Sequence, residues 1–392
     1  MLDEWSDDVI NSDTFFGIVC ATAVAPKHLY HPVLPCKMAG KLYYSLRDED
    51  LIEQVWTSVE IKKAYEVGYS FTVHVYHEYK FKEGVWNPFL RKMYLQKLMN
   101  SGKAPERAED RDRLAADHEK FGMGDLIKNS FSNWGSNPAK RAAAKIAINS
   151  IWGKHCQKHR LEDHKFFGEY DEAADEMFML IENSASGLKE MISFSPYGEM
   201  HLLKTRDSGN SNIDLHHDYL PAGVFVPAYA RLKLLKILEP LGKRVLYHDT
   251  DSIIYVHDKT PGAFNPSFGT ALGDFAEEGP SKEGIIKFCA SAPKSYALKV
   301  KNGKDVVKIK GISLKHGHQE KMAFETIFNT IKHGGKTSNP QMTFKNTPGS
   351  HIETIYFEKM FQFNKSDLKG DLHDDGYIYP HGYCHTDEGM SN

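Results

Sequence analysis

Two carboxylates are separated by a single residue in the segment Asp249-Thr-Asp251-Ser252, which lies between two runs of apolar residues. The flanking runs 244–247 and 253–256 favour strands and the tetrapeptide favours a turn, so the segment predicts a β-hairpin. Alternation of side chains along a strand predicts that Asp249 and Asp251 share one face. Paired carboxylates on a rigid hairpin suit Mg²⁺, which prefers hard oxygen ligands and leaves room for substrate phosphates. An acidic turn in solvent is the alternative interpretation of this segment taken alone.

A second group of polar residues is predicted on one face of a helix spanning 138–154. An Asn-Pro pair opens this segment, an Ala-rich run favours the helix, and Gly153 marks its expected end. Lys145, Asn149 and Trp152 stand at i, i+4 and i+7 and therefore lie along one face. An ammonium can hold a triphosphate, an amide can position it, and a large ring can pack on a sugar or base. An ordinary amphipathic surface helix would explain the same pattern.

With these two motifs in order, the chain resembles family B DNA polymerases, most closely their protein-primed branch from linear plasmids, viruses and self-synthesising transposons. The residues Tyr247 to Ser252 match Y-x-D-T-D-S, and Lys145 to Gly153 match K-x-x-x-N-S-x-Y-G with Trp152 at the aromatic position. Several ordered motifs are far more specific than any one of them. The further matches are Lys294-Ser-Tyr296 to K-x-Y, the run Lys308-Ile-Lys310-Gly311, the segment Val226 to Arg231 with Pro227 in place of the usual Thr, Phe16 to Val19 with Leu29 to Pro35, and Tyr379 to Tyr383.

The resemblance implies two-metal nucleotidyl transfer, in which a primer 3′-hydroxyl attacks the α-phosphate of a deoxynucleoside triphosphate and pyrophosphate leaves. It makes Asp249 and Asp251 the catalytic residues and the ligands of Mg²⁺ or Mn²⁺. The implied nucleotide-binding residues are Lys145, Asn149, Trp152 and Lys97. The implied DNA-binding residues are Tyr229, Arg231, Lys294, Tyr296, Lys308 and Lys310. The implied partners are template-primer DNA, deoxynucleoside triphosphates, a terminal protein that acts as primer, and an upstream polymerase and exonuclease chain.

Two motifs of these polymerases have no match in the sequence. The family takes a further catalytic Asp from D-x-x-S-L-Y-P, and its proofreading exonuclease carries D-x-E. Residues 1–14 contain Asp3, Asp7, Asp8 and Asp13, but none is followed by Ser-Leu-Tyr-Pro. The chain is therefore expected to be the C-terminal part of a larger polymerase.

Other functions stay open at this point. The chain could be a catalytically inactive remnant that binds DNA or a terminal protein, or one subunit of a split polymerase whose upstream chain supplies the missing Asp. A metal-dependent phosphohydrolase could use D-T-D, but it would need neither the N-S-x-W-G helix nor K-x-Y. A reverse transcriptase shares paired Asp residues, but its signature is not D-T-D-S beside these motifs.

Composition indicates an ordinary globular protein. The 392 residues, 41% of them hydrophobic, can form two or three domains, and the formal net charge of −3 makes a passive DNA-coating protein an unsuitable interpretation. Five scattered cysteines without a C-x-x-C pair favour a reduced, intracellular setting, which could be cytoplasm, nucleus or mitochondrion. No apolar run is long enough for a membrane span, so no membrane partner is expected. Cys156, His159 and His164 have metal-like spacing but lack a fourth ligand, so no zinc is expected.

The expected fold class is α+β with a right-hand polymerase architecture: a partial palm with an antiparallel sheet, two-helix fingers and a small thumb. Local patterns predict strands at 16–25 and 70–79, and the resemblance implies helices at 86–99 and 224–238. A capping box at Thr57 predicts a further helix that Gly68 closes. The expected parts are 1–84 as N-terminal palm with an insertion like the terminal-protein region, 85–154 as fingers, 155–310 as palm with the D-T-D-S hairpin, and 311–392 as thumb and C-terminal tail.

Overall fold

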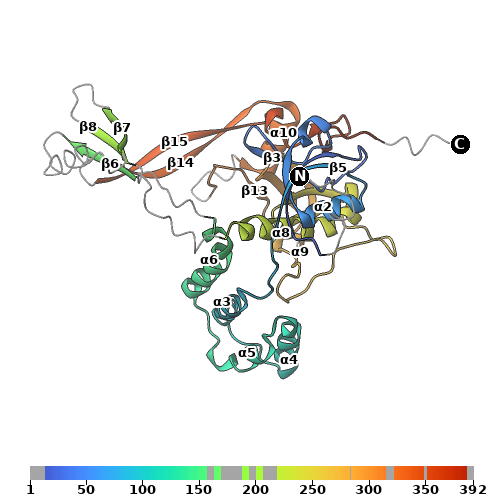
Figure 1. Cartoon of the computed structure of the whole chain (residues 1–392). Coiled ribbons are helices and arrows are strands. Elements are labelled where there is room, and N and C mark those ends of the chain that lie inside the picture. Colours follow the sequence, from blue (N-terminus) through green and yellow to red (C-terminus); the bar gives the residue numbers. More distant parts are fainter. Residues whose placement is uncertain are drawn as a thin grey trace.

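The computed structural model describes residues 14–156, 163–168, 188–193, 200–205, 219–282, 284–314, 322–347 and 351–385. Over these residues, sheets of two or three antiparallel strands alternate with helices along the chain (Figure 1). This mixture agrees with the predicted α+β class.

The N-terminal sheet places β1 (Gly17–Val24) between β4 (Gln54–Thr57) and β5 (Ser70–Glu78), and both neighbours run antiparallel to it. Side chains of β1 alternate between buried and more exposed positions, as a strand with one covered face requires. The buried face joins the largest hydrophobic core together with α8 (Leu220–Leu241). The strands predicted at 16–25 and 70–79 are confirmed.

The helix α2 (Ser58–Glu66) follows β4 directly, and a capping box fixes its start. The Thr57 hydroxyl accepts the Glu60 N–H, and the Glu60 carboxylate accepts the Thr57 N–H at 3.3 Å. These bonds satisfy two of the N–H groups that a helix start leaves without helical partners. Beyond the helix, Gly68 has φ +96°, a conformation that glycine adopts without steric cost. The predicted helix and its closing glycine are therefore both confirmed.

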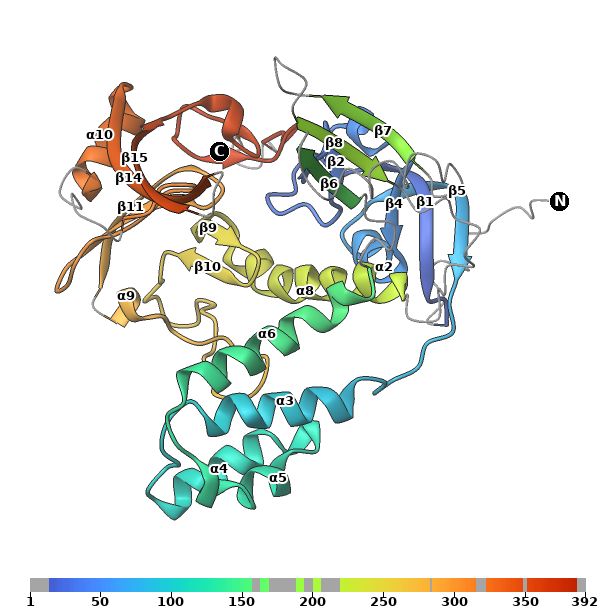
Figure 2. The ribbon, with the colours of Figure 1, turned by 90° about the vertical axis from the view of Figure 1, so that its left-hand side faces the viewer.

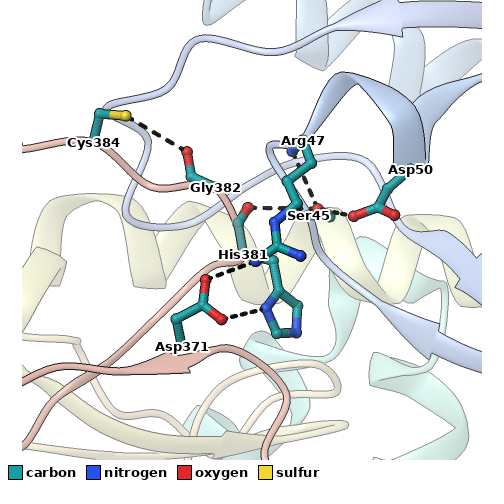
Figure 3. Close-up of polar contacts among 7 residues, drawn as sticks. All are labelled: Ser45, Arg47, Asp50, Asp371, His381, Gly382 and Cys384. Atoms are coloured by element: carbon teal, nitrogen blue, oxygen red, sulfur yellow. Dashed lines mark hydrogen bonds and ion pairs between the residues drawn. The ribbon is translucent and has the colours of Figure 1, made fainter.

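The C-terminal segment lies against the N-terminal region. The Leu46 N–H donates to the His381 carbonyl at 2.7 Å. The His381 ring bonds the Asp371 carboxylate at 2.8 Å, and Arg47 pairs with the same carboxylate at 3.3 Å (Figure 3). Segments more than 300 residues apart in sequence are thus tied by polar contacts. The short elements at this junction are β2 (Cys36–Met38), β3 (Lys41–Tyr43), the 3₁₀ turns η1 (Asp48–Leu51) and η8 (Lys365–Asp367), β16 (Asp371–Leu372) and β17 (Ile378–Tyr379).

A helical unit extends from the sheets, with α3 packed along α6 and α6 reaching α8 (Figure 2). At the start of α6 the Asn137 side chain accepts the Lys140 N–H at 3.0 Å, and Pro138 occupies the first turn. The unit also contains the charged helix α4, half of whose residues are exposed. The elements of this unit are α3 (Asn87–Met99), α4 (Ala108–Asp117), η2 (Glu119–Phe121), α5 (Gly124–Lys128), η3 (Phe131–Asn133) and α6 (Pro138–Lys154).

The long helix α8 leads into the predicted hairpin. It exceeds the predicted span 224–238 at both ends, because Pro221 suits a first helical turn and Gly242 provides the positive φ that ends it. The elements that follow are η6 (Gly242–Arg244), β9 (Val245–Asp249), β10 (Ser252–Tyr255), α9 (Gly279–Lys282), β11 (Ile285–Ala292), β12 (Ser295–Val300) and β13 (Val306–Lys308). The last three strands form one sheet in the order β11-β12-β13.

A long hairpin projects beyond this sheet (Figure 1). It pairs β14 (Lys336–Thr347) with β15 (His351–Gln362), and α10 (Phe324–His333) joins the base of β15 and the β11-β12-β13 sheet in a second core. A separate sheet has the order β6-β8-β7 and consists of β6 (Asp163–Gly168), β7 (Leu188–Ser193) and β8 (Met200–Thr205). None of the described helices is long and apolar enough to cross a membrane.

Candidate active site

The two carboxylates of D-T-D-S lie at the tip of the β9-β10 hairpin. Asp249 is the last residue of β9 and pairs with Ser252, so Thr250 and Asp251 form the turn. Thr250 has φ +57°, and the Asp251 N–H donates to the Asp249 carbonyl at 2.6 Å. This bond between residues i and i+2 at positive φ describes a γ-turn of the rarer, strained hand. The alternation argument does not extend to Asp251, because the strand ends before it, and a shared face for the two carboxylates stays a prediction.

Hydroxyl groups brace the tip. Thr250 Oγ1 donates to Asp249 Oδ1 at 2.9 Å, and Ser252 Oγ donates to the Asp249 carbonyl at 3.1 Å. Asp251 is exposed, whereas the Asp249 side chain is 30% exposed. Asp249 is consequently the more fixed carboxylate, and Asp251 is open to solvent.

The K-x-Y motif meets this hairpin directly. Lys294 Nζ lies 3.1 Å from Asp249 Oδ2. The backbone of Lys294 is left-handed, with φ +63°, and its N–H donates to the Tyr247 hydroxyl at 2.8 Å. Two motifs that are more than 40 residues apart in sequence are thus joined by an ion pair and a hydrogen bond.

Tyrosine rings extend the contact toward β13. The Tyr247 and Tyr296 ring centroids are 5.1 Å apart, and Lys308 Nζ lies 5.5 Å from the Tyr296 centroid. A hydrogen bond to Tyr296 raises the pKa of Lys308. Burial raises the pKa of Tyr247, so this phenol stays neutral at physiological pH. Lys310 is exposed nearby in sequence, and its backbone N–H donates to Ser295 Oγ at 3.1 Å.

A basic cluster lies between α3 and α6. Lys145 and Asn149 are exposed on α6, and Trp152 is half-buried one turn further on. Burial, and then the charges of Arg141 and Lys145, lower the pKa of Lys97 on α3. The structure therefore brings the two predicted lysines together. Sequence reasoning missed Arg141, although its position four residues before Lys145 places it on the same helix face.

Two of the predicted DNA-binding residues lie on α8. Tyr229 is 47% exposed, and burial of the rest of its side chain raises its pKa. Arg231 instead faces Glu60, with Nε and Nη2 at 2.9 and 2.6 Å from the same carboxylate oxygen. The Glu60 side chain is 3% exposed, so the pair links α2 to α8 in the interior. DNA binding by Arg231 stays a prediction, and its guanidinium already has a buried anionic partner.

The donor set at the hairpin tip fits one Mg²⁺ shared with a triphosphate, because Mg²⁺ is commonly held by one or two carboxylates plus substrate phosphates. Asp249 already holds the Lys294 ammonium, which shows that a cation can occupy this carboxylate. Among the described residues, no cluster of three or more His, Cys, Asp or Glu side chains could hold a metal ion. Of Cys156, His159 and His164, whose spacing resembles that of metal ligands, His159 and the side chain of His164 lie outside the described residues. The four N-terminal candidates Asp3, Asp7, Asp8 and Asp13 also lie outside them.

Comparison with known proteins finds a similar fold in one DNA polymerase. No protein-family model and no curated protein matches the sequence. A solved structure that is similar is Phi29 DNA polymerase complexed with primer-template DNA, in a post-translocation binary complex. The match has a TM-score of 0.50 at 16% sequence identity and covers 89% of this chain and 50% of the polymerase chain. The chain thus spans half the length of that polymerase, and the likeness concerns the fold.

Proposed function

We propose that this chain carries the C-terminal polymerase part of a protein-primed family B DNA polymerase and catalyses template-directed deoxynucleotidyl transfer. The observation that carries this proposal is the contact between Lys294 of K-x-Y and Asp249 of D-T-D-S. Sequence spacing alone did not require these motifs to meet, and a polymerase needs both at the primer terminus. The similarity in fold to a DNA polymerase supports the same conclusion.

In this proposal the molecule has a right-hand architecture. The palm comprises the N-terminal sheet, α8, the β9-β10 hairpin and the β11-β12-β13 sheet. The fingers are the unit from α3 to α6, whose basic cluster faces the incoming triphosphate. The thumb begins after Gly311 and includes α10 with the β14-β15 hairpin, and the region before residue 84 contains the contact surface for the terminal protein.

The predicted metal-binding and nucleotide-binding residues would have different roles in the reaction. Asp249 and Asp251 would hold Mg²⁺ or Mn²⁺, which supplies charge neutralisation at the attacking and leaving oxygens. Lys145 and Lys97 would bind the triphosphate oxygens and stabilise the charge that builds on pyrophosphate as it leaves. Asn149 and Trp152 would orient the sugar and base so that the α-phosphate lies in line with the primer 3′-hydroxyl.

The remaining predicted residues would hold DNA. Lys294, Lys308 and Lys310 would contact phosphates, and Tyr229 and Tyr296 would support the strands beside them. Contacts of this kind are independent of sequence and weaken as salt rises. DNA binding should accordingly show no sequence preference and a steep salt dependence.

A further carboxylate is required for two-metal chemistry, and the D-x-x-S-L-Y-P motif that would supply it has no match in this sequence. We propose that an upstream polymerase and exonuclease chain provides it. Among the described strands, β9 and β10 pair only with each other, as the addition of a further strand would require.

Primer extension on a template-primer tests the proposal. The intact chain is assayed with Mg²⁺ and with Mn²⁺, without and with an added chain that carries the D-x-x-S-L-Y-P segment. Asp251→Asn and Asp249→Asn, which keep side-chain volume but remove the charge, are assayed beside it. Extension that both substitutions reduce by orders of magnitude would support the proposed catalysis by this chain. Equal extension by all three proteins would refute the assigned roles and indicate a contaminating polymerase.

A second function is kept because the third carboxylate has no match: a non-catalytic chain that binds DNA or a terminal protein. It predicts no extension by any variant while salt-sensitive DNA binding persists. Because both functions include DNA binding, extension by the wild type in the presence of the added upstream chain separates them, and fluorescence anisotropy on the same duplex establishes that each protein binds DNA.

A further inference from the structure

Lys294 is bound to a carboxylate that the proposed function assigns to a metal. Its ammonium lies 3.1 Å from Asp249 Oδ2, although 62% of the Lys294 side chain is exposed to solvent. A long exposed lysine has many other conformations open to it, and holding one of them costs side-chain entropy. The contact is therefore one that a competing ion can exchange.

The backbone directs the lysine toward this carboxylate. Lys294 sits in the turn between β11 and β12 with φ +63°, an unusual conformation for a residue with a side chain. The Tyr247 hydroxyl accepts its N–H at 2.8 Å and so anchors the turn to β9, the strand that ends at Asp249. Tyr247 is thus a positioning residue for Lys294.

Two cations cannot share Asp249 Oδ2 without repulsion. A divalent ion at this oxygen would lie within a few ångströms of the ammonium, where like charges oppose each other strongly. The lysine would then need another anion. A phosphate of the primer strand would be within reach if DNA lies along the K-x-Y strand, as the proposed function requires.

We propose that Lys294 is an exchangeable counter-ion of Asp249, which moves from this carboxylate to a DNA phosphate when a divalent cation binds. Both the metal at Asp249 and the identity of the second anion rest on the proposed function. Binding free energies are reciprocal, so DNA that withdraws the lysine must strengthen metal binding by the same factor by which the metal strengthens DNA binding.

The first experiment measures Mn²⁺ binding to the DNA-free protein by electron paramagnetic resonance of the free ion. Exposed ion pairs contribute about 0.2 to 1 kcal/mol, so Lys294→Met should tighten Mn²⁺ binding by a factor of about 1.4 to 5. Lys294→Arg keeps the counter-ion and should bind Mn²⁺ like the wild type. Lys308→Met removes an equal charge that lies on Tyr296 and should leave Mn²⁺ affinity unchanged.

Several outcomes overturn the proposal. Unchanged or weaker Mn²⁺ binding by Lys294→Met would mean that the ion pair does not compete with the metal. Equal tightening in Lys308→Met would mean that general charge, and not the contact, sets the affinity. Circular dichroism and melting temperature establish that each variant is folded before the comparison is made.

The second experiment measures duplex affinity by anisotropy with and without Ca²⁺ at constant ionic strength. The gain in affinity on adding Ca²⁺ should be larger in the wild type than in Lys294→Met, by the same factor of about 1.4 to 5. An equal gain in both proteins would overturn the transfer to DNA. If the wild type extends a primer but Lys294→Met leaves Mn²⁺ binding to the DNA-free protein unchanged, this inference alone fails. If Lys294→Met tightens Mn²⁺ binding as expected but the protein does not bind DNA, the proposed function fails.

Discussion

The pair between Arg231 and Glu60 yields a prediction that separates a structural role from a DNA-binding role. In Arg231→Met the side-chain volume is nearly kept, but the charge and its hydrogen bonds are lost. Glu60 would then be an unpaired carboxylate whose side chain is 3% exposed. Its remaining partners would be the hydroxyl and N–H of Thr57, at 2.8 and 3.3 Å.

The size of the effect follows from burial. Removing one member of a buried ion pair costs about 3 to 5 kcal/mol, because the other charge stays desolvated without its partner. The Arg231 side chain is 29% exposed and Thr57 still donates to Glu60, so we expect the lower end, about 3 kcal/mol. If the 392-residue chain unfolds cooperatively, that corresponds to a fall in melting temperature of about 4 °C.

A double-mutant cycle with Glu60→Gln measures the pair itself. Gln can still accept the Thr57 N–H in the capping box, and the double variant carries no unpaired buried charge. The double variant should therefore be more stable than Arg231→Met alone, with a coupling energy of roughly 2 kcal/mol. Urea unfolding followed by circular dichroism, and duplex binding over a salt series, are measured on all four proteins.

The structural reasoning would be refuted if Arg231→Met kept the wild-type unfolding midpoint. A loss of DNA affinity in that variant, with a salt slope smaller by about one, would instead assign Arg231 to a phosphate. Lys236→Ala, which removes an exposed charge from the same helix, is the matched control and should change neither quantity.

Three further predictions concern single side chains. Lys97→Met should stabilise the helical unit by roughly 0.3 kcal/mol, because it removes a repelled charge, and should raise the KM for the deoxynucleoside triphosphate about tenfold. Thermal melting measures the first effect and steady-state primer extension the second. An unchanged KM would contradict the assignment of Lys97 to the triphosphate. Burial lowers the pKa of His31 to about 4, so between pH 6.5 and 4 the unfolded state binds more protons than the folded state. The free energy of unfolding should therefore fall by up to about 3 kcal/mol as pH drops through this window. If His31→Gln keeps the wild-type dependence of stability on pH, this cause is refuted. Thr250→Gly should raise stability by roughly 0.5 kcal/mol, because glycine adopts the positive φ of this position without strain. It should also slow primer extension, because the hydroxyl that hydrogen-bonds Asp249 is lost. Faster extension would contradict that role of the hydroxyl.

Local patterns determined several of the elements from sequence alone. The capping box at Thr57, the Asn137 cap of α6 and the D-T-D-S hairpin are each set by neighbouring residues, so short windows predicted them correctly. The resemblance to family B polymerases likewise used motifs within single segments. Similarity of the fold to a DNA polymerase agrees with that resemblance, while the roles of the site residues stay predictions.

The turn at the centre of the hairpin was only partly predictable. Alternation holds along an extended strand, but the strand ends at Asp249 and the chain reverses through a left-handed Thr250. The residue types of D-T-D-S predict a turn but do not specify which residue is the last of the strand. The relation between the two carboxylates was therefore decided by turn geometry.

Contacts between distant segments were decided by tertiary structure alone. Nothing near Arg231 in the sequence indicates Glu60, and nothing near Asp249 indicates Lys294, because each pair is joined only when separate elements pack. The lowered pKa of Lys97 arises in the same way, from burial and from charges on a neighbouring helix. Sequence determined which chemical groups this protein carries, and packing decided which of them meet, since electrostatic interactions depend on distance and burial that only the folded chain sets.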